Sequence, residues 1–165
     1  MSVELFPVNG AKLYIGGPTS AKAADHVEAD FDGVTWVEID GWQSCGALND
    51  DTQTITTSLI NRPRDSNSKG TKNAAPTEMI FAVLPEDPGQ EDLYEADASR
   101  FNYNFRIVWD DAPAAVGSTP SESLFIALVG SVGERGGEAN TTRMLGASLQ
   151  RNSNIVPVAA VEGGA

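Results

Sequence analysis

The chain has 165 residues, 41% of them hydrophobic, and a formal net charge of −12 at pH 7. The length favours one domain, residues 1–165, whose core needs no disulfide or metal to hold it together. Cys45 and His26 are the only residues of their kinds, which excludes an intramolecular disulfide and a zinc site of the usual ligand sets within one chain. The acidic charge argues against binding nucleic acid through its phosphates, and no window of the sequence is apolar enough to span a membrane. We therefore expect a soluble protein without a signal peptide, made in a reducing cytosol.

The first third of the chain predicts few regular elements. Residues 1–20 are expected to form an N-terminal arm with one short strand at 13–15, and a loop continues to residue 33. Apolar and polar side chains alternate in 35–40, which predicts a strand with one polar face. The threonine-rich run 52–60 predicts another strand, which we expect to pair with 35–40.

The segment 61–76 (NRPRDSNSKGTKNAAP) is rich in turn-forming residues and lacks hydrophobic periodicity, so it predicts a long loop between strands. Four of the eleven basic residues of the chain lie in this loop: Arg62, Arg64, Lys69 and Lys72. Polar segments such as 61–76 and 110–121 lack the apolar area to order themselves. Both can remain disordered until a neighbouring molecule binds.

A strand and a helix follow the loop. The run 79–84 is apolar on both faces and predicts a buried strand. Asp87 as N-cap and Pro88 at the first helical position predict the only helix, which ends at Ser99. Its apolar stripe, which we expect to cover one side of the sheet, consists of Leu93, Tyr94 and Ala98. The helix region is also strongly acidic, with Glu86, Asp87, Glu91, Asp92, Glu95 and Asp97 within twelve residues.

The segment 101–109 (FNYNFRIVW) is the element around which we expect the rest of the chain to be arranged. Its large side chains are Phe101, Tyr103, Phe105, Ile107 and Trp109, and they alternate with Asn102, Asn104, Arg106 and Val108. This alternation predicts a strand with one buried face, and the aromatic rings on that face carry much of the apolar area of a small core.

The C-terminal third predicts three more strands. The run 124–129 is apolar on both faces, the glycine-rich segment 130–137 predicts a turn, and 141–150 alternates loosely. A short strand at 155–158 precedes a flexible C-terminus, residues 159–165. About eight strands and one flanking helix predict a mainly β (α+β) fold, a β-sandwich or barrel.

No catalytic, metal-binding or cofactor-binding site is predicted. His26 lies in an acidic, loop-like stretch and is expected to be solvated. The segment 30–33 begins like a calcium loop, but Val34 stands where a ligand is needed and Thr35 where a glycine is needed. Most carboxylates, including Glu38 and Asp40, are interpreted as a charged surface rather than an acid–base pair, so we expect no enzyme activity.

The order of these segments resembles the major tail tube protein of long-tailed (siphovirus-type) bacteriophages, a family that shares its fold with the tube protein of type VI secretion systems. The resemblance covers about residues 30–158. It rests on TWVEIDGW, the long polar loop, MIFAVL, the acidic helix, FNYNFRIVW, LFIALVGSV and TTRMLGASLQ, in this order.

The resemblance implies a virion protein assembled in the host cytoplasm. Its subunits would form hexameric rings that stack into the tail tube, through which DNA is ejected without specific binding. It also implies contacts between rings from residues 1–20, 61–76 and 155–165, and a helix outside the inner barrel. The expected partners are other copies of the chain, the tape measure protein, the tail terminator and the distal tail or baseplate proteins.

Charge suggests how rings would contact each other. The basic residues of 61–72 are opposite in sign to the carboxylates of the helix region. We hypothesise that the loop packs on the acidic surface of the neighbouring ring and fixes its orientation and register. The alternative is a solvated, mobile loop.

Three other classes of protein stay open. A monomeric or trimeric β-sandwich binding or decoration module would present an exposed aromatic groove, for which Trp36 and Trp42 are the candidates. A tail terminator or head–tail joining protein of the same fold would form rings that do not stack indefinitely. A hydrolase would need a pair of carboxylates with a tuned pKa in a pocket.

Overall fold

The computed structural model describes residues 4–164, so parts of the predicted segments 1–20 and 159–165 lie outside the described residues. Within this range the chain forms one α-helix, one 3-10 turn and ten strands. The elements are β1 (Lys12–Thr19), η1 (Glu28–Phe31), β2 (Val37–Ile39), β3 (Trp42–Cys45), β4 (Asp50–Thr57), β5 (Ser66–Ala74), β6 (Thr77–Ala82), α1 (Pro88–Ala98), β7 (Asn102–Val108), β8 (Glu122–Arg135), β9 (Met144–Arg151) and β10 (Val156–Val158).

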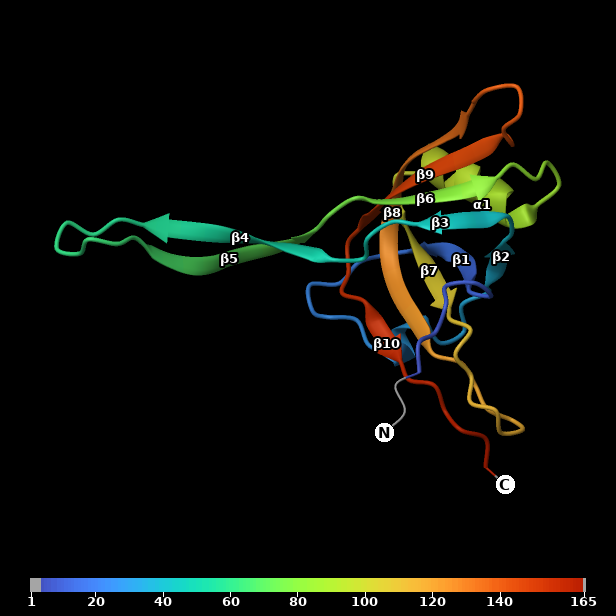
Figure 1. The fold of residues 1–165 in the computed structure, drawn as a ribbon, viewed down its shortest axis with the longest axis horizontal. Coiled ribbons are helices and arrows are strands. Elements are labelled where there is room, and N and C mark those ends of the chain that lie inside the picture. Colours follow the sequence, from blue (N-terminus) through green and yellow to red (C-terminus); the bar gives the residue numbers. More distant parts are fainter. Residues whose placement is uncertain (1–3, 165) are drawn as a thin grey trace.

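Eight strands form one antiparallel sheet in the order β2-β1-β7-β8-β9-β6-β3, with β10 added along β8 (Figure 1). The strands at the two ends of this order, β2 and β3, are separated in the chain only by Asp40 and Gly41. Two residues cannot cross a flat sheet of seven strands, so the sheet must roll until its edges meet. Gly41 makes the connection with φ 77°, a conformation that favours glycine. The predicted mainly β fold class with one flanking helix is confirmed.

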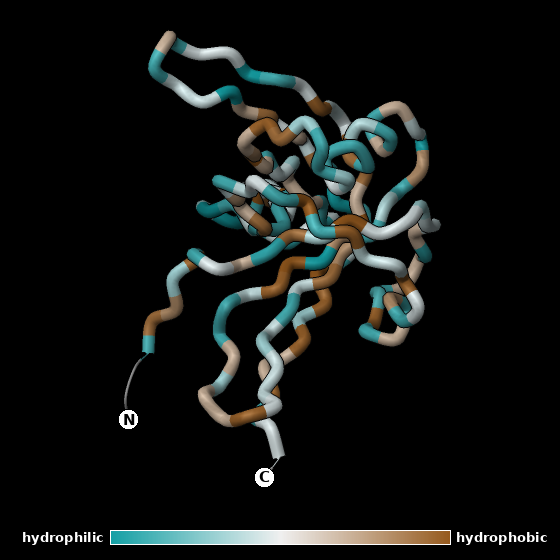
Figure 2. The backbone as a smooth tube through the Cα atoms, turned by 90° about the vertical axis from the view of Figure 1, so that its right-hand side faces the viewer, coloured by the Kyte–Doolittle hydropathy of each residue, from teal (hydrophilic) through white to brown (hydrophobic). Residues whose placement is uncertain are grey.

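The main core fills the inside of the rolled sheet, and β7 contributes its centre as predicted. Tyr103, Phe105 and Ile107 are all buried on one face of this strand. The ring of Phe105 stacks on Phe125 of β8, with 5.5 Å between centroids. Phe101, in contrast, precedes the strand and is 55% exposed, so it lies outside the predicted buried face. In Figure 2 the apolar segments cross the centre of the body and most surrounding loops are polar.

The helix α1 closes one side of this core and begins as predicted. The Asp87 carboxylate accepts a hydrogen bond from the Gln90 backbone, and Pro88 occupies the first turn. The predicted apolar stripe is wrong in part: α1 buries Gly89, Gln90, Leu93 and Ala96, whereas Tyr94 and Ala98 are exposed.

Gln90 and Gly89 explain why the buried face of the helix differs from the predicted one. The side chain of Gln90 is buried because its amide donates to the carbonyls of Asp40 and Ala82 and its oxygen accepts from Leu84. It therefore ties the helix to the turn after β2 and to the end of β6. Gly89 packs so closely on β2 that a Cβ atom there would lie 2.3 Å from the Glu38 carbonyl.

A smaller apolar cluster covers the outer face of β8. Leu124 and Ile126 pack there with Phe31 and with Val156 of β10. The prediction that 124–129 is buried on both faces is therefore confirmed. In the strand predicted at 79–84, Met79 and Phe81 are buried but Ile80 and Ala82 on the opposite face are only half-buried.

Two predictions about strand pairing are wrong. β2 pairs with β1, with Ile15 opposite Val37, and the predicted strand 52–60 does not pair with it. Instead β4 pairs with β5, which occupies residues 66–74 of the predicted loop 61–76. The glycine-rich segment 130–137 is not a turn before residue 136, because β8 continues to Arg135 along β9.

Candidate assembly interface

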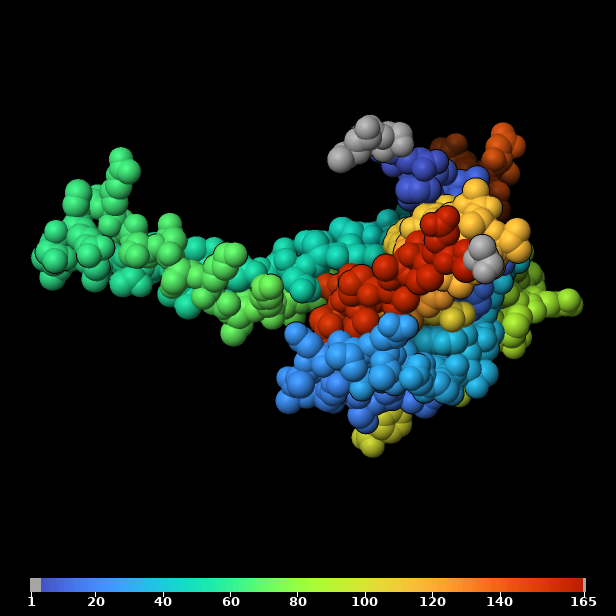
Figure 3. Space-filling model, turned by 90° about the horizontal axis from the view of Figure 1, so that it is seen from below, coloured from blue at the N-terminus to red at the C-terminus, as the bar shows by residue number. Residues whose placement is uncertain are grey.

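The hairpin of β4 and β5 leaves the body as an arm, defined here as residues 50–74 (Figures 1 and 3). Its strands pair only with each other, from Asp50 opposite Ala74 to Thr57 opposite Ser66. Both faces are solvated: between residues 51 and 73 only Thr52 and Gly70 are even half-buried. The eight residues of β4 and the nine of β5 extend the arm by about 25 Å. A two-stranded hairpin without a core is marginally stable alone. Along most of its length no other part of residues 4–164 covers this arm.

Consecutive residues at the end of β9 clamp both strands of the arm to the body. The Gln150 side chain donates to the carbonyl of Ala74, the last residue of β5, at 2.8 Å. The Arg151 guanidinium donates to the carbonyl of Asn49 at 3.0 Å and to the carboxylate of Asp50, the first residue of β4. Because the Arg151 side chain is only 3% exposed, this is a buried, directional anchor. It fixes the direction in which the arm projects.

We expect Arg151→Gln to loosen the base of the arm and to lower the free energy of unfolding by about 2 kcal/mol, because it removes charged hydrogen bonds at a buried position. Hydrogen exchange should accelerate at residues 50–52 and 72–74, and chemical denaturation should measure the loss of stability. Arg135→Gln is the matched control, because the ion pair of Arg135 with Glu78 is 50% exposed on each side. It should cost less than about 1 kcal/mol.

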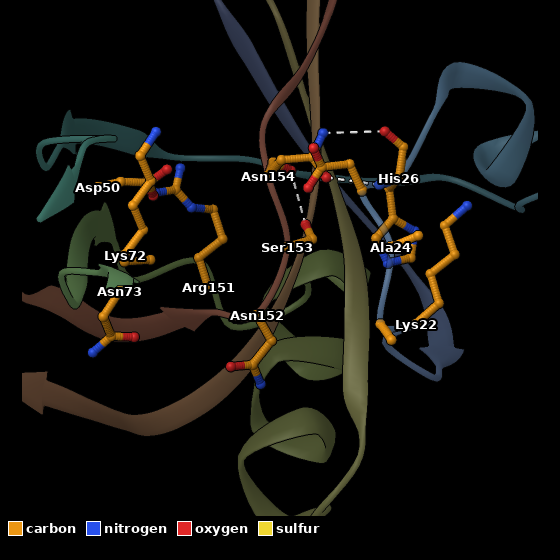
Figure 4. Close-up of a pocket in the computed structure, with 13 residues that line it drawn as sticks. Lys22, Ala24, His26, Asp50, Lys72, Asn73, Arg151, Asn152, Ser153 and Asn154 are labelled. Atoms are coloured by element: carbon orange, nitrogen blue, oxygen red, sulfur yellow. Dashed lines mark hydrogen bonds and ion pairs between the residues drawn. The ribbon is translucent and has the colours of Figure 1, made fainter. Parts of the chain in front are cut away.

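A polar cavity of about 350 Å³ lies beside this clamp (Figure 4). Asp50 and Lys72 of the arm form one wall, and the segment 22–26 forms the other. His26 lines this wall but is only 6% exposed, so the prediction of a solvated histidine is wrong. Its backbone exchanges two hydrogen bonds with the side chain of Asn154, at 2.7 and 3.1 Å, which pull the loop onto the body.

The structure offers no metal centre in its described part. Within residues 4–164 no group of three acidic, cysteine or histidine residues could hold a metal ion. Asp30, from the segment that begins like a calcium loop, is bound by Lys22 and by the Val27 backbone, and these hydrogen bonds lower the pKa of its carboxyl. No helix between residues 4 and 164 is long and apolar enough to cross a membrane.

The four basic residues of the arm are divided between its tip and β5. Arg62 and Arg64 belong to the tip, defined as residues 58–65, whereas Lys69 and Lys72 lie along β5. All four are exposed, and none forms an ion pair with any residue of 4–164. Among the other lysine and arginine side chains of residues 4–164, only Arg100 also forms no ion pair.

The six predicted acidic residues gather around α1 as expected. Glu86 and Asp87 precede the helix, and Glu91, Asp92, Glu95 and Asp97 lie on it. None of the six forms an ion pair within the described residues. The structure does not bring the acidic and basic sets together, because α1 and the arm tip lie at opposite ends of the molecule (Figure 1). A contact between them requires two copies of the chain.

The pKa of Asp92 is affected by its burial and by the other negative charges on α1. Partial burial raises the pKa of its carboxyl first, and the neighbouring carboxylates of Glu95, Glu91 and Asp87 raise it further. Because the raised pKa belongs to the folded state, stability falls as the pH rises through it.

We therefore expect Asp92→Asn to raise the Tm of the protein at pH 7. The gain should vanish as the pH falls below the ordinary aspartate pKa, where both states of the wild type are protonated. Thermal unfolding at pH 7 and pH 3 measures the effect. A Tm difference that grew on acidification would contradict the prediction.

The aromatic groove of the alternative binding module is not formed. Trp36 packs with the outer cluster and lies 5.0 Å from the Arg106 guanidinium, whereas Trp42 packs against the main core. The indole nitrogen of Trp42 donates to the Ser44 carbonyl at 3.1 Å. The two rings thus belong to different clusters and do not line a common groove.

No family model matches the sequence, and a search of curated proteins finds no significant match. Solved structures do match over nearly the whole chain. A chain of the SPP1 tail tube superimposes with a TM-score of 0.63 and 13% identity, covering 94% of this chain and 81% of that one. The chain has the tail-tube fold.

Two further structures extend this likeness. A chain from the baseplate of the anti-feeding prophage gives a TM-score of 0.67 at 12% identity and covers 96% of this chain and 98% of that one. A chain from the sheath/tube terminator of an extracellular contractile injection system gives 0.66 at 12% identity, with coverage of 96% and 100%. The tail-tube fold therefore accounts for almost all of the chain.

The sequence predicted the acidic helix correctly, but it did not predict the contacts of the candidate interface that join residues far apart in the chain. The Gln150 and Arg151 clamp joins residues that are 76 and 102 positions apart from their partners. Neither a local sequence pattern nor a resemblance in fold indicates which distant residues form such hydrogen bonds. The pair Leu59 and Ile60 was a detectable signal, since two large apolar residues stand directly before the turn-rich segment 61–76.

Proposed function

We propose that this protein is the structural subunit of a phage tail tube, in which six copies form a ring and rings stack around a channel for DNA ejection. The observation that carries the proposal is an arm without a core of its own on a body with the tail-tube fold. Hydrogen bonds to β9 anchor the arm at its base, and the arm is exposed along its length. Docking on another copy would supply the partner surface that a marginally stable hairpin lacks, which favours assembly.

The proposed contacts between rings involve three segments. Of residues 61–76, all but the last two belong to the arm, and this segment would dock on the acidic α1 region of another copy. The described part of residues 1–20 adds exposed apolar side chains, with Leu5 87%, Phe6 57% and Val8 63% exposed. In the segment 155–165, Val161 pairs with Thr119 through hydrogen bonds of 2.9 and 3.1 Å, which leaves its side chain 59% exposed beside the loop 110–121.

The net charge of −12 suits a conduit for DNA. An acidic wall repels the phosphate backbone, so DNA could slide through the lumen, whereas a basic wall would hold it by counterion release. In this function the protein has no enzyme activity and resides in the virion tail after assembly in the host cytoplasm. It would contact the tape measure protein along the lumen and the terminator and distal tail or baseplate proteins at the tube ends.

The second candidate is a tail terminator or joining protein. The observation in its favour is that the terminator chain matches this fold as well as the tail-tube chain does, with TM-scores of 0.66 and 0.63. A terminator would form single rings that bind one end of a tube. The two functions therefore differ in whether rings stack on one another.

Negative-stain electron microscopy of the purified protein across a concentration series tests the proposal. We expect hollow tubes, or short stacks of six-fold rings, that lengthen as the concentration rises. Single rings that never stack would favour the terminator. Small separate particles at every concentration, also after addition of preformed tail tips as nuclei, would overturn both.

A further inference from the structure

Two neighbouring surface cavities of about 440 and 450 Å³ flank the segment between β6 and α1. They share Leu84, Pro85 and Asp87 as lining residues. Leu84 is 37% exposed and Tyr94, at the edge of the second cavity, is 44% exposed. This is an apolar floor that no other part of residues 4–164 covers. Exposed apolar area that is concave and rimmed by polar groups is typical of an interaction site.

The rim of these cavities is acidic. Glu86 and Asp87 border the first cavity, and Asp87 and Glu91 border the second. The one cation in the lining, Arg143, is already engaged by Glu134, an ion pair that raises the pKa of the guanidinium. The carboxylates of Glu86, Asp87 and Glu91 have no cationic partner among the described residues. The surface thus fits an apolar group with positive charges beside it.

The tip of the arm has this complementary character. The turn is closed by a hydrogen bond from the Arg62 backbone to the Leu59 carbonyl at 3.1 Å, and it carries Ile60 fully exposed at its end. Leu59 is 42% exposed. Arg62 and Arg64 follow directly, while the one carboxylate of the tip, Asp65, accepts a hydrogen bond from Ser58 at 2.6 Å. The tip is therefore an apolar knob with two free guanidinium groups.

We propose that the tip of one copy docks in this surface of the next copy, with Ile60 against Leu84 and Pro85 and with the guanidinium groups of the tip on Asp87 and Glu91. The inference rests on the proposed tube assembly and names the surface that receives the arm.

The position of the two surfaces explains why the contact joins copies rather than closing within one. The tip and the segment between β6 and α1 lie at opposite ends of the longest axis, in two perpendicular views (Figures 1 and 3). A contact between opposite ends of identical molecules is heterologous, and it continues from copy to copy when the rotation does not close. An open stack of rings needs this kind of contact.

Disulfide trapping tests the contact in assembled protein. In a Cys45→Ser background, Ile60→Cys is combined with Leu84→Cys, and tubes are oxidised and separated on a non-reducing gel. A disulfide requires Cα atoms about 4.4–6.8 Å apart, so a ladder of multimers places the two residues against each other. The control replaces Leu84→Cys by Val116→Cys, which lies on a different loop and is 94% exposed. It should stay monomeric.

The outcomes separate this inference from the proposed function. Tubes that form without a ladder overturn the docking site and leave tube assembly standing. Absence of tubes from the wild-type protein overturns the assembly on which the inference rests.

If the cysteine variant does not assemble, the contact is tested instead by exchanging the charges of two residues. Arg64→Glu or Glu91→Arg alone should reduce tube yield at limiting concentration at least tenfold. The double variant should recover to within about twofold of wild type. Wild-type yield from both single variants, or no recovery in the double variant, overturns the docking site.

Discussion

Reversing the charges of the arm should stop tube growth while leaving the subunit folded. The variant carries glutamate at positions 62, 64, 69 and 72, where the wild type has exposed cations without an ionic partner in the described chain. An exposed ion pair contributes only about 0.2–1 kcal/mol, so the four together amount to about 1–4 kcal/mol for each arm. A hexameric ring would repeat this loss at every arm and add repulsion from the acidic helix. Electron microscopy should show no tubes at concentrations at which the wild type assembles, and circular dichroism should show an unchanged Tm.

The reversal also makes an acidic chain more acidic, and general repulsion between subunits could by itself prevent assembly. A compensating variant separates the two causes. It adds lysine in place of Glu86, Glu91, Glu95 and Asp97, which restores the net charge and the opposite signs of the two surfaces. Tubes should return in this variant. Tubes of normal length from the reversed arm alone would show that its cations do not act in stacking.

The elements that could be predicted from the sequence are those whose burial or capping leaves a local pattern. β7 could be predicted because Tyr103, Phe105 and Ile107 enter the core at every second position, and this leaves a period of two in the sequence. The start of α1 could be predicted because Asp87 and Pro88 act through neighbouring backbone atoms alone. In both cases the physical cause lies within a few residues.

The arm could not be predicted for the opposite reason. β5 has solvent on both faces, so nothing selects apolar residues at alternate positions, and SNSKGTKNA resembles a loop. Its partner is decided by the hairpin itself and by the clamp from β9. His26 shows the same limit: its burial comes from hydrogen bonds to Asn154, 128 residues away. Such contacts depend on the completed fold and leave no local pattern.

The helix α1 was predicted in part: its start followed from local sequence, but its buried face did not. Tyr94 and Ala98 fit an apolar stripe, but the helix instead turns Gly89 and Gln90 inward, since Gly89 allows close contact with β2 and Gln90 binds three backbone groups. A hydrophobicity pattern cannot identify a buried glutamine, because its burial depends on carbonyl groups from β6 and from the turn after β2. The exposed face of the helix, which carries the acidic residues, follows from this contact.

Phe105→Ala should be the most destabilising single substitution in β7. The side chain is completely buried and stacks on Phe125, so its removal costs about 3–5 kcal/mol in lost burial and in the cavity that remains. A domain of this size has a total stability of about 5–15 kcal/mol. Each kcal/mol shifts the Tm by about 2–4 °C, so we expect a fall of roughly 6–20 °C in thermal unfolding.

Phe101→Ala is the matched control, with the same change of side chain four residues earlier. Phe101 is 55% exposed and precedes β7, so its loss should cost less than about 1 kcal/mol. The alternation in the sequence alone treats the two phenylalanines as equivalent, whereas the structure separates them. Equal losses of stability from the two substitutions would contradict the prediction. They would mean that β7 begins at residue 101 and that the ring of Phe101 is also buried in the core. Phe101 lines neither of the two cavities beside the segment between β6 and α1, so the control should also assemble like the wild type.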